Sequence, residues 1–580
     1  MIDQIHKEIN NFLSEIENIN SDTLNLINQK YSISICDDLQ KGHLTSNVCM
    51  IAASICKTSP DELANKLEKR LKNLKVFKDV HKAGPGFINI TLKRIDFISI
   101  IKKISTEKEK FGHSNLGKDK KIQIEFVSAN PTGPLHVGHG RGAAYGDAIA
   151  RVLRATGHIV EKEYYVNDAG RQIDILTASI ILKKIAKHIN NFFPKNGYQG
   201  EYISEISNKF NDVQDIDPAN YQNIAKDISS DPEQEIDEII IKLKNINIDY
   251  WNAIKEFSLQ EIINSISNDL NDFNVSFDNW FYESSLGRID NKSSEIGLSI
   301  NKLVKNGAYE KDGAIWLNTE SSGDDKHRVL VREDGRATYF ASDVAYHKNK
   351  IDRGFNTLIN IWGADHHGYI KRIEASIDAL GSDSKKLIVK LVQFANLYKE
   401  GEKVKMSTRS GDFFTLKKLI DDIGPDAARF YYLSKQADQH LDFDIDLAKS
   451  DSKENIFYYI QYAHARIYSL QEKFNQAHFE DINNHTDNVE NGSYIKCDKL
   501  IHEISKYPNI VKKAALTLQP HIIIFYLKDL SQLLHSFYND NHVLSETPEN
   551  MLSIIKCLSA VKQVISNGLG ILGISALKKM

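Results

Sequence analysis

The chain is poor in the features that mark secreted and membrane proteins. It has five cysteines in 580 residues, and none of them forms a C-x-x-C pair: Cys36, Cys49, Cys56, Cys497 and Cys557. They are too few and too scattered for a disulfide scaffold, so we expect reduced, mostly buried thiols. The first residues lack a signal-peptide core, and no apolar run is long enough to span a bilayer. These absences predict a cytoplasmic protein with no membrane partner.

The chain also lacks a strong net charge. Its 73 Lys+Arg residues against 77 Asp+Glu residues leave a formal charge of −4 at pH 7. A uniformly basic surface is thereby excluded, so any nucleic-acid partner has to be met by local basic patches. At 580 residues the chain is long enough for several domains and a sizeable buried core. We therefore expect a large multidomain enzyme.

The most informative segment that is present covers residues 126–141. A strand is predicted over 121–127, a loop with Pro131, Gly133 and Pro134 follows, and a helix is predicted from about residue 136 to residue 155. The first N–H groups of a helix are unpaired and its dipole is positive there. This junction therefore suits an anionic phosphate.

Two histidines stand at the start of the predicted helix. His136 and His139 are three residues apart, so both imidazoles project from one face of the first turn. Gly138 lies between them, and its missing side chain lets a flat ring approach the backbone. Two imidazoles that can donate to a triphosphate, beside a bare surface for a purine, indicate ATP held for attack at phosphorus.

Two other interpretations of these residues compete with ATP binding. A His-x-x-His pair on a helix can bind zinc, but no Glu or Cys sits beside it at ligand spacing. Residues 138–143 fit the dinucleotide fingerprint G-x-G-x-x-A, with Glu161 and Glu163 near the distance of a ribose-binding acid. That fingerprint needs its glycines directly after the strand, whereas residues 128–137 intervene here. We therefore expect neither zinc nor a dinucleotide.

Residues 136–139, His-Val-Gly-His, resemble the HIGH signature of class I aminoacyl-tRNA synthetases. The second signature of that class, the KMSKS loop, resembles residues 404–409, with Lys405 in the first lysine position. Thr408 replaces the second lysine. The cations left to contact pyrophosphate are Arg409, Lys403 and Lys399. One His-x-Gly-His alone would be a weak signal, but the two signatures in this order and at this separation are a strong one.

Wider matches point to the arginyl-tRNA synthetases within this class. They cover most of the chain and are weakest over about 180–310. The segments that carry them are 125–134, 165–170, 363–368, 426–433 and 440–444. The resemblance implies an arginine–tRNA ligase of the bacterial type. Such an enzyme uses ATP with Mg²⁺ to activate L-arginine, and transfers it to the 2′-hydroxyl of the terminal adenosine of tRNA(Arg).

The resemblance also implies roles for individual residues. The catalytic ones are His136, His139 and Lys405. The ATP-binding ones are Ala129, Asn130, Pro131, Thr132, Gly133, Pro134, Leu135, His136, Val137, Gly138, His139, Gly363, Asp365, Lys405, Met406 and Ser407. Those that match arginine-binding positions are Glu125, Asn130, Tyr339, Asp343 and Asp365. Contact with the tRNA anticodon is implied for Tyr459 and for Met580, the last residue.

The arginine-binding positions also have a physical rationale. A guanidinium has five donors, so its pocket needs acidic partners with fixed geometry. Tyr339 and Asp343 are one helical turn apart, so both side chains can face one cavity. Glu125 lies in an apolar strand next to the ATP loop, where a buried acid needs a cation. That cation is either the α-amino group of the substrate or a neighbouring Lys or Arg, and the sequence does not choose between them.

The pattern of elements predicts three regions. Residues 1–115 form a small α/β domain that resembles the tRNA-contacting N-terminal domain of arginyl enzymes. Residues 116–424 alternate strands and helices, which predicts a Rossmann-like α/β catalytic domain with a parallel sheet and a helical insertion at about 180–310. Residues 425–580 are predicted to be an all-α bundle that resembles the DALR anticodon-binding domain. We expect the chain to act as a monomer.

Two other functions compete with arginine–tRNA ligation. The chain could be another class I synthetase that uses the same ATP site, or a catalytically inactive paralogue that binds tRNA. The presence of His136, His139 and Lys405 opposes the inactive paralogue, and the acidic positions expected for a guanidinium oppose another amino acid.

Overall fold

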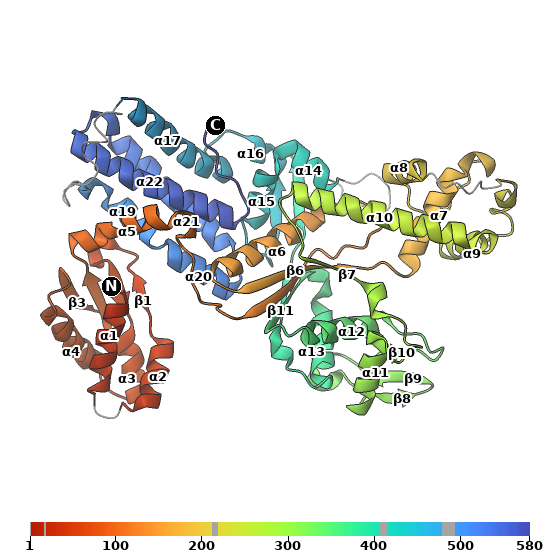
Figure 1. Cartoon of the computed structure of the whole chain (residues 1–580), viewed down its shortest axis with the longest axis horizontal. Helices are drawn as coiled ribbons and strands as arrows, with labels where there is room; N and C mark the ends of the chain where they lie inside the picture. The colour runs from red at the N-terminus through yellow and green to blue at the C-terminus, as the bar shows by residue number, and fades with distance from the viewer. Residues whose placement is uncertain (1, 17–18, 211–217, 405–413, 478–493) are drawn as a thin grey trace.

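The computed structural model describes residues 2–16, 19–210, 218–404, 414–477 and 494–580. These residues form an elongated molecule with a central parallel sheet, a helical bundle on one side and a helical arm on the other (Figure 1). The mixed α/β class with a parallel sheet and a helical C-terminal domain is the one that the sequence predicted. Residues 425–580, predicted to be all-α, also contain one short strand, β15 (Leu441–Asp444), which pairs with β13 (Ala395–Lys399). Within the described part of the chain, no helix combines the length and the apolar character needed to cross a membrane.

The central sheet is parallel and has five strands in the order β12-β11-β5-β6-β7. The strands are β5 (Lys121–Glu125), β6 (Ile159–Val166), β7 (Asn279–Tyr282), β11 (Thr357–Gly363) and β12 (Leu387–Val392). The direction of winding therefore reverses between β5 and β11. Ligands of doubly wound sheets bind outside the carboxyl ends of the strands at such a reversal. The loops after β5 and β11 are thus the expected place for a site.

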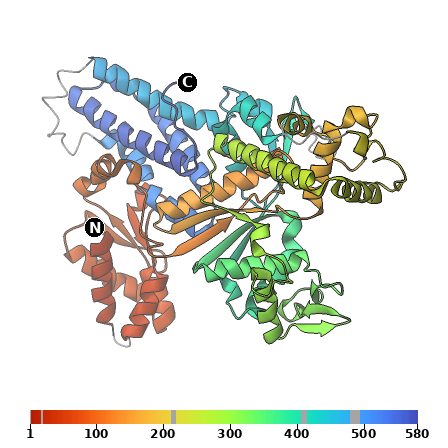
Figure 2. The same ribbon diagram turned by 45° about the vertical axis from the view of Figure 1, so that its right-hand side comes forward.

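Helices cover both faces of this sheet. In Figures 1 and 2, α6 (Val137–Ala155) lies on one face, and α12 (Tyr339–Asp352) and α13 (Ile370–Ala379) lie on the other. Small residues let α6 approach the sheet closely: a Cβ at Gly146 would lie 2.3 Å from the ring of Phe126. The expected helix boundaries, 136–155, are close to the observed ones because a proline-containing loop and a cap mark its start.

The segment between β6 and β7 is the expected helical insertion. It contains α7 (Arg171–Lys184), α8 (Glu201–Lys209), α9 (Pro232–Ile246) and α10 (Ile248–Asp272), which form the arm on the right of Figure 1. The sequence did not predict β7, which lies inside the range 180–310 and completes the main sheet. Four residues, three of them aromatic, are too short a strand to show alternation.

A small sheet follows β7 before the chain returns to the main sheet. It comes after α11 (Glu295–Lys305) and has the antiparallel order β10-β9-β8. Its strands are β8 (Tyr309–Lys311), β9 (Ala314–Leu317) and β10 (Arg328–Val331). The segment after β10 leads into α12.

The N-terminal module has a core of its own. An antiparallel sheet in the order β1-β2-β4-β3 packs against helices through buried aliphatic side chains. Its elements are α1 (Ile2–Ser14), α2 (Ser21–Lys30), β1 (Ile33–Ile35), β2 (Leu44–Ser46), α3 (Val48–Cys56), α4 (Pro60–Asn73), β3 (Asp79–Ala83) and β4 (Phe87–Thr91). The module meets the C-terminal bundle where the carbonyl of Cys36 lies 2.7 Å from Nε2 of His502.

The C-terminal helices share one continuous hydrophobic core with the central sheet. They are α14 (Leu416–Ile423), α15 (Pro425–Leu433), α17 (Ile456–Ala477), α19 (Asp498–Ser505), α20 (Tyr507–Thr517), α21 (His521–Asp540) and α22 (Pro548–Ile571). From α15 onward these helices fall within residues 425–580, where the sequence predicted a helical bundle. The final residues return to α17, where Nε2 of Gln461 donates to the carbonyl of Ser575 at 2.7 Å.

A buried arginine joins α15 to the rest of the molecule. The guanidinium of Arg429 donates to Oδ2 of Asp147, on α6, at 2.7 Å, and neither side chain is exposed. It also donates to the carbonyls of Phe273 at 3.0 Å and of Leu572 at 2.9 Å. Arg429 therefore fixes the end of the helical arm and the C-terminal tail against the helix that begins at the histidines.

Candidate active site

The two histidines close the first turn of α6. His136 is the N-cap residue, and its Nδ1 accepts the N–H of Gly138 at 3.0 Å. Nδ1 of His139 accepts the N–H of His136 at 3.3 Å, and the two rings stack with centroids 3.7 Å apart. Because both Nδ1 atoms accept, each neutral ring carries its proton on Nε2. Each histidine thus keeps one N–H donor for a ligand.

The environment keeps both imidazoles neutral. Burial lowers the pKa of His136. Burial, with a smaller contribution from His136, lowers the pKa of His139 to about 3. At neutral pH the pair therefore offers two uncharged N–H donors, which can bind phosphate oxygens without a proton being gained or lost.

A cavity of about 380 Å³ opens at the reversal of strand order between β5 and β11. Its walls are the loop after β5, the two histidines, the start of α6, and the end of β11 with the turn after it, which supply Gly363 and Asp365. Gly138 contributes no side chain, and a Cβ there would lie 2.7 Å from the His136 ring and 3.2 Å from Phe394. The cavity has the position and the flat, glycine-lined wall expected for a nucleotide, and we refer to it as the nucleotide cavity.

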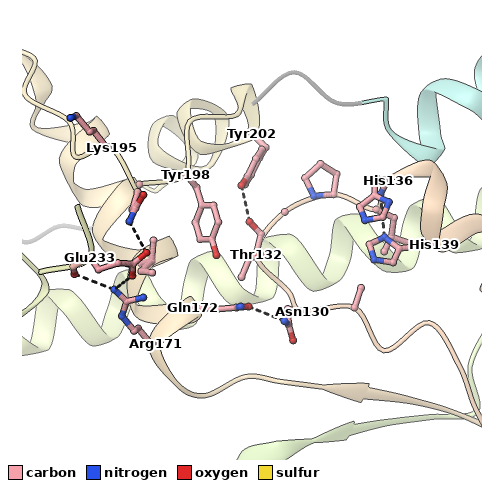
Figure 3. A pocket seen from close by; sticks show the side chains of 17 residues that line it. Asn130, Thr132, His136, His139, Arg171, Gln172, Lys195, Tyr198, Tyr202 and Glu233 are labelled. Atoms are coloured by element: carbon pink, nitrogen blue, oxygen red, sulfur yellow. Dashed lines mark hydrogen bonds and ion pairs between the residues drawn. The ribbon is translucent and has the colours of Figure 1, made fainter. Parts of the chain in front are cut away.

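A second cavity, of about 430 Å³, lies on the other side of the same loop (Figure 3). Ala129, Asn130, His136 and His139 line both cavities, so the loop separates them. The opposite wall comes from the helical insertion and includes Gln172, Tyr198 and Tyr202. The insertion therefore touches the candidate active site directly.

Tyr339 lines a third cavity, of about 300 Å³, at the start of α12. Tyr339 is 65 % exposed at its mouth, and Glu283 and Ser342 stand in the wall. Asp343, one turn further along α12, is not part of that lining; its carboxylate accepts the hydroxyl of Tyr369. The expected pair thus lies at two depths, with Tyr339 at the surface and Asp343 further in.

Three carboxyl groups lie near one another at this third cavity: Glu283 in its wall, and Asp343 and Glu125 outside its lining. Burial, opposed by the hydroxyl of Tyr369 and aided by the carboxylates of Glu125 and Glu283, raises the pKa of Asp343 to about 7. Burial also raises the pKa of Glu283. Acids that share a partly desolvated site hold their charge best when a cation binds there. The arrangement therefore favours a positively charged ligand.

The structure supplies a protein cation for Glu125. Its Oε2 lies 2.5 Å from Nζ of Lys350, a side chain with no exposed surface, and its Oε1 accepts the hydroxyl of Ser128 at 3.2 Å. Asp365 is exposed and lies in the nucleotide cavity, away from Tyr339. The sequence left open which cation pairs with Glu125, and in the structure it is Lys350. The resemblance grouped Asp365 with Tyr339, whereas the structure places these two residues in different cavities.

Further predicted positions have separate outcomes. The dinucleotide interpretation is excluded, because residues 138–143 belong to α6 and both Glu161 and Glu163 pair with Arg353 at 2.5 Å. Lys405, Met406 and Ser407 lie outside the described residues. Glu283 was missed, since it follows the unexpected strand β7 directly.

The bundle carries an aromatic group on α17 and α21. The rings of Tyr458 and Tyr462 stack at 6.1 Å, and Tyr462 stacks on His535 at 5.5 Å. The ring of Tyr459 lies 4.5 Å from His535, while Met580 is 53 % exposed. Tyr462 is 41 % exposed, so this group offers a ring face to a ligand.

Family models match three consecutive parts of the chain. Residues 3–92 match "Arginyl tRNA synthetase N terminal domain", and residues 100–444 match "tRNA synthetases class I (R), catalytic domain". Residues 460–580 match "DALR anticodon binding domain".

Whole proteins match over nearly the full length. The arginine–tRNA ligase of Acinetobacter baumannii is 42 % identical over 95 % of this chain and 96 % of its own length. That of Thioalkalivibrio sulfidiphilus is 41 % identical over 94 % of each chain. The solved Thermus thermophilus arginyl-tRNA synthetase has a TM-score of 0.71 and 18 % identity, with both chains fully covered. This last match shows the shared fold.

Proposed function

Because the chain belongs to the class I arginyl-tRNA synthetase family, we propose that it joins L-arginine to tRNA(Arg) at the site around His136 and His139, at the expense of ATP. The observation that carries this site assignment is the pair of neutral Nε2–H donors beside the nucleotide cavity. The alternative of a catalytically inactive tRNA-binding protein leaves these preorganised donors without a use.

The first step forms arginyl-adenylate. A carboxylate oxygen of arginine attacks the α-phosphorus of ATP, and the bond from that phosphorus to the bridging oxygen breaks, so that pyrophosphate leaves with the electron pair. The two Nε2–H groups donate to phosphate oxygens as negative charge builds on them. Donors that are already in place cost no reorganisation, which makes this kind of stabilisation effective. Mg²⁺ accompanies the nucleotide and offsets its charge, and Lys405 is proposed to contact the pyrophosphate.

The second step transfers arginine to tRNA. The 2′-oxygen of the terminal adenosine attacks the activated carbonyl carbon, its proton is released to solvent, and AMP departs with the electrons of the broken acyl–phosphate bond. No covalent enzyme intermediate is formed. The protein's part is to hold the reactants in line, a contribution that can be large.

The pocket for the arginine side chain is proposed at the third cavity. Tyr339 covers its mouth, Glu283 stands in its wall, and Asp343 lies one helical turn deeper. A guanidinium there would meet the carboxylate of Glu283 in the wall and extend toward Asp343 behind it, and acidic partners at fixed positions suit its forked donors. We place the α-ammonium group near the loop residue Asn130 and the carboxylate Glu125, which it would share with Lys350.

The remaining surfaces are proposed to bind tRNA. Residues 1–115 would contact the outer corner of the tRNA, residues 116–424 the reacting 3′ end, and residues 425–580 the anticodon. Tyr459, Tyr462 and Met580 lie on the anticodon-binding part, where exposed rings can stack on unpaired bases. The enzyme is proposed to act as a monomer in the cytoplasm.

One assay tests this function. ATP–pyrophosphate exchange is measured with each of the twenty amino acids, with and without tRNA. Arginine alone should support exchange, and only when tRNA is present, as is usual in this family. Exchange with a different amino acid would replace arginine as the substrate, and no exchange with any of them would overturn the catalytic assignment.

A further inference from the structure

The loop between β5 and α6 bends sharply where it leaves the sheet. Val127 has φ 67° and Ser128 has φ 41°, both in the left-handed region that residues with a side chain rarely adopt. For β-branched Val127 this conformation is a genuine outlier, and such conformations persist only where the surroundings impose them. The loop therefore depends on contacts from outside itself.

Two tyrosines hold the backbone of this loop. The hydroxyl of Tyr164, on β6, donates to the carbonyl of Ala129 at 2.9 Å. The hydroxyl of Tyr202, on α8 of the insertion, donates to the carbonyl of Thr132 at 2.7 Å (Figure 3). The ring of Tyr202 also lies against the loop, since a Cβ at Gly133 would be only 3.0 Å from its Cζ and its hydroxyl. One restraint thus comes from the sheet and one from the insertion.

A third contact also comes from the insertion. Nδ2 of Asn130 donates to Oε1 of Gln172, at the start of α7, at 2.8 Å. The start of α7 is itself fixed, because its neighbour Arg171 pairs with Glu233 and Asp237 of α9, both at 2.7 Å. Figure 3 shows the contacts of Asn130 with Gln172 and of Arg171 with Glu233.

These contacts bear on the chemistry because the loop ends at His136. Residues 129–135 lead without interruption to the N-cap of α6, so a shift at Thr132 moves the imidazole of His136, which lines the nucleotide cavity. We propose that Tyr202, assisted by Gln172, is a positioning residue for adenylate formation, and that holding the ATP loop is a function of the insertion. This inference rests on the proposed function.

The test removes one oxygen atom. In Tyr202→Phe the ring still packs against Gly133, but the hydrogen bond to Thr132 is lost. We expect kcat of the tRNA-dependent arginine exchange to fall about three- to tenfold, the range for one net hydrogen bond, with the KM for arginine and the affinity for tRNA unchanged. Tyr221→Phe is the matched control. It removes a hydroxyl from the same insertion at a buried position that does not line the cavity, and should leave kcat unchanged.

A double mutant separates positioning from a general loss of structure. If Tyr202 acts through the loop that leads to His136, adding Tyr202→Phe to the His136→Asn variant should lower kcat little further. A structural role would instead lower the Tm and give the same loss in both backgrounds. Equal losses in both backgrounds, or an unchanged kcat in the single mutant of an active enzyme, would overturn the inference.

A second measurement does not need activity. Hydrogen exchange of the amides of residues 126–136 should be faster in Tyr202→Phe than in the wild type, and unchanged in Tyr221→Phe. A wild-type protein that fails to activate arginine would refute the proposed function, while faster exchange would still support the restraint on the loop. If the hydrogen-exchange rates in Tyr202→Phe equal those of the wild type, Tyr202 does not restrain the loop, even if the enzyme is active.

Discussion

Lys350 and Glu125 form a buried ion pair between α12 and the end of β5, with Nζ and Oε2 2.5 Å apart. The same Nζ donates to Oδ1 of Asn360 on β11 at 2.9 Å and lies 4.2 Å from the centre of the Tyr346 ring. The helix that carries Tyr339 and Asp343 is thereby fastened to the strand that leads into the ATP loop. The proposed pockets for arginine and for ATP thus share one rigid connection.

Replacing Lys350 by Met should strongly destabilise the protein. It leaves the Glu125 carboxylate buried without its cation, and breaking one side of a buried pair typically costs about 3–5 kcal/mol. The measurement is the free energy of unfolding in urea. The matched variant is Lys350→Met combined with Glu125→Gln, which removes the stranded charge and should recover most of the loss. A stable single mutant would mean that the pair contributes nothing to holding α12.

His136→Asn should separate the cap from the chemistry. Asn is a good N-cap residue, so it can still accept the N–H of Gly138 and keep α6 intact. It has no donor in the position of Nε2, and losing one preorganised donor typically lowers kcat by about 10²–10³. Rapid-quench measurement of adenylate formation, alongside a tRNA-binding assay, should show a large fall in the rate and little change in affinity. Near wild-type charging by the folded variant would contradict the role of His136.

Arginine binding should weaken as the pH falls through about 7. The raised pKa of Asp343, about 7, means that the free enzyme carries increasing amounts of the neutral acid below that pH. The KM for arginine should then rise toward tenfold per pH unit, and arginine binding near neutrality should release a proton. Calorimetry in buffers of different ionisation enthalpy measures that release. Asp343→Asn should have a high KM for arginine that no longer depends on pH, with the KM for ATP nearly unchanged.

The same carboxyl group should affect stability with the opposite trend. Its pKa in the folded state lies above its ordinary value of about 3.9, so the folded protein binds this proton more tightly than the unfolded chain does. The contribution of Asp343 to the unfolding free energy is therefore largest below about pH 4 and is lost as the pH rises through about 7. Urea titrations over a range of pH give the unfolding free energy of the wild type and of Asp343→Asn, and the difference between the two pH profiles is the contribution of Asp343. A contribution that grows between pH 4 and 7 would reverse this assignment.

Tyr462→Ala should weaken tRNA binding without changing its salt dependence. Stacking of a base on an aromatic ring is worth about 1–3 kcal/mol, whereas the salt slope reports phosphate contacts. Tyr462→Phe keeps the exposed ring and should bind normally. Filter binding over a range of salt concentrations measures both quantities. Full affinity in the alanine variant would exclude Tyr462 from base contact.

The elements of the site that could be predicted from the sequence have local causes. The strand at 121–127, the loop prolines and the helix start at about 136 lie within a few residues of one another, so β5 and α6 were found close to their observed ends. Turns and helix caps depend on residues that are neighbours in the chain, so the local sequence is enough to locate them.

The contacts that these residues make with distant parts of the chain could not be predicted, because they depend on strand order and on how the insertion folds. Glu125 meets Lys350 across 225 residues, and Thr132 meets Tyr202 across 70. The first contact follows from β11 lying beside β5, and the second from the way the insertion folds back over the loop. Glu283 was missed for a related reason, since β7 is too short to be read from its pattern and the residue after it had no assigned place.

The buried Arg429 has a consequence for synthesis of the protein on the ribosome. Asp147 is made early, but the guanidinium that neutralises it comes 282 residues later, and that guanidinium must in turn reach the carbonyl of Leu572, close to the end of the chain. The middle of α6, where Asp147 lies, therefore cannot take its final environment until Leu572 has left the ribosome. A nascent chain that has already made both histidines therefore still lacks the finished packing of the helix that begins with them.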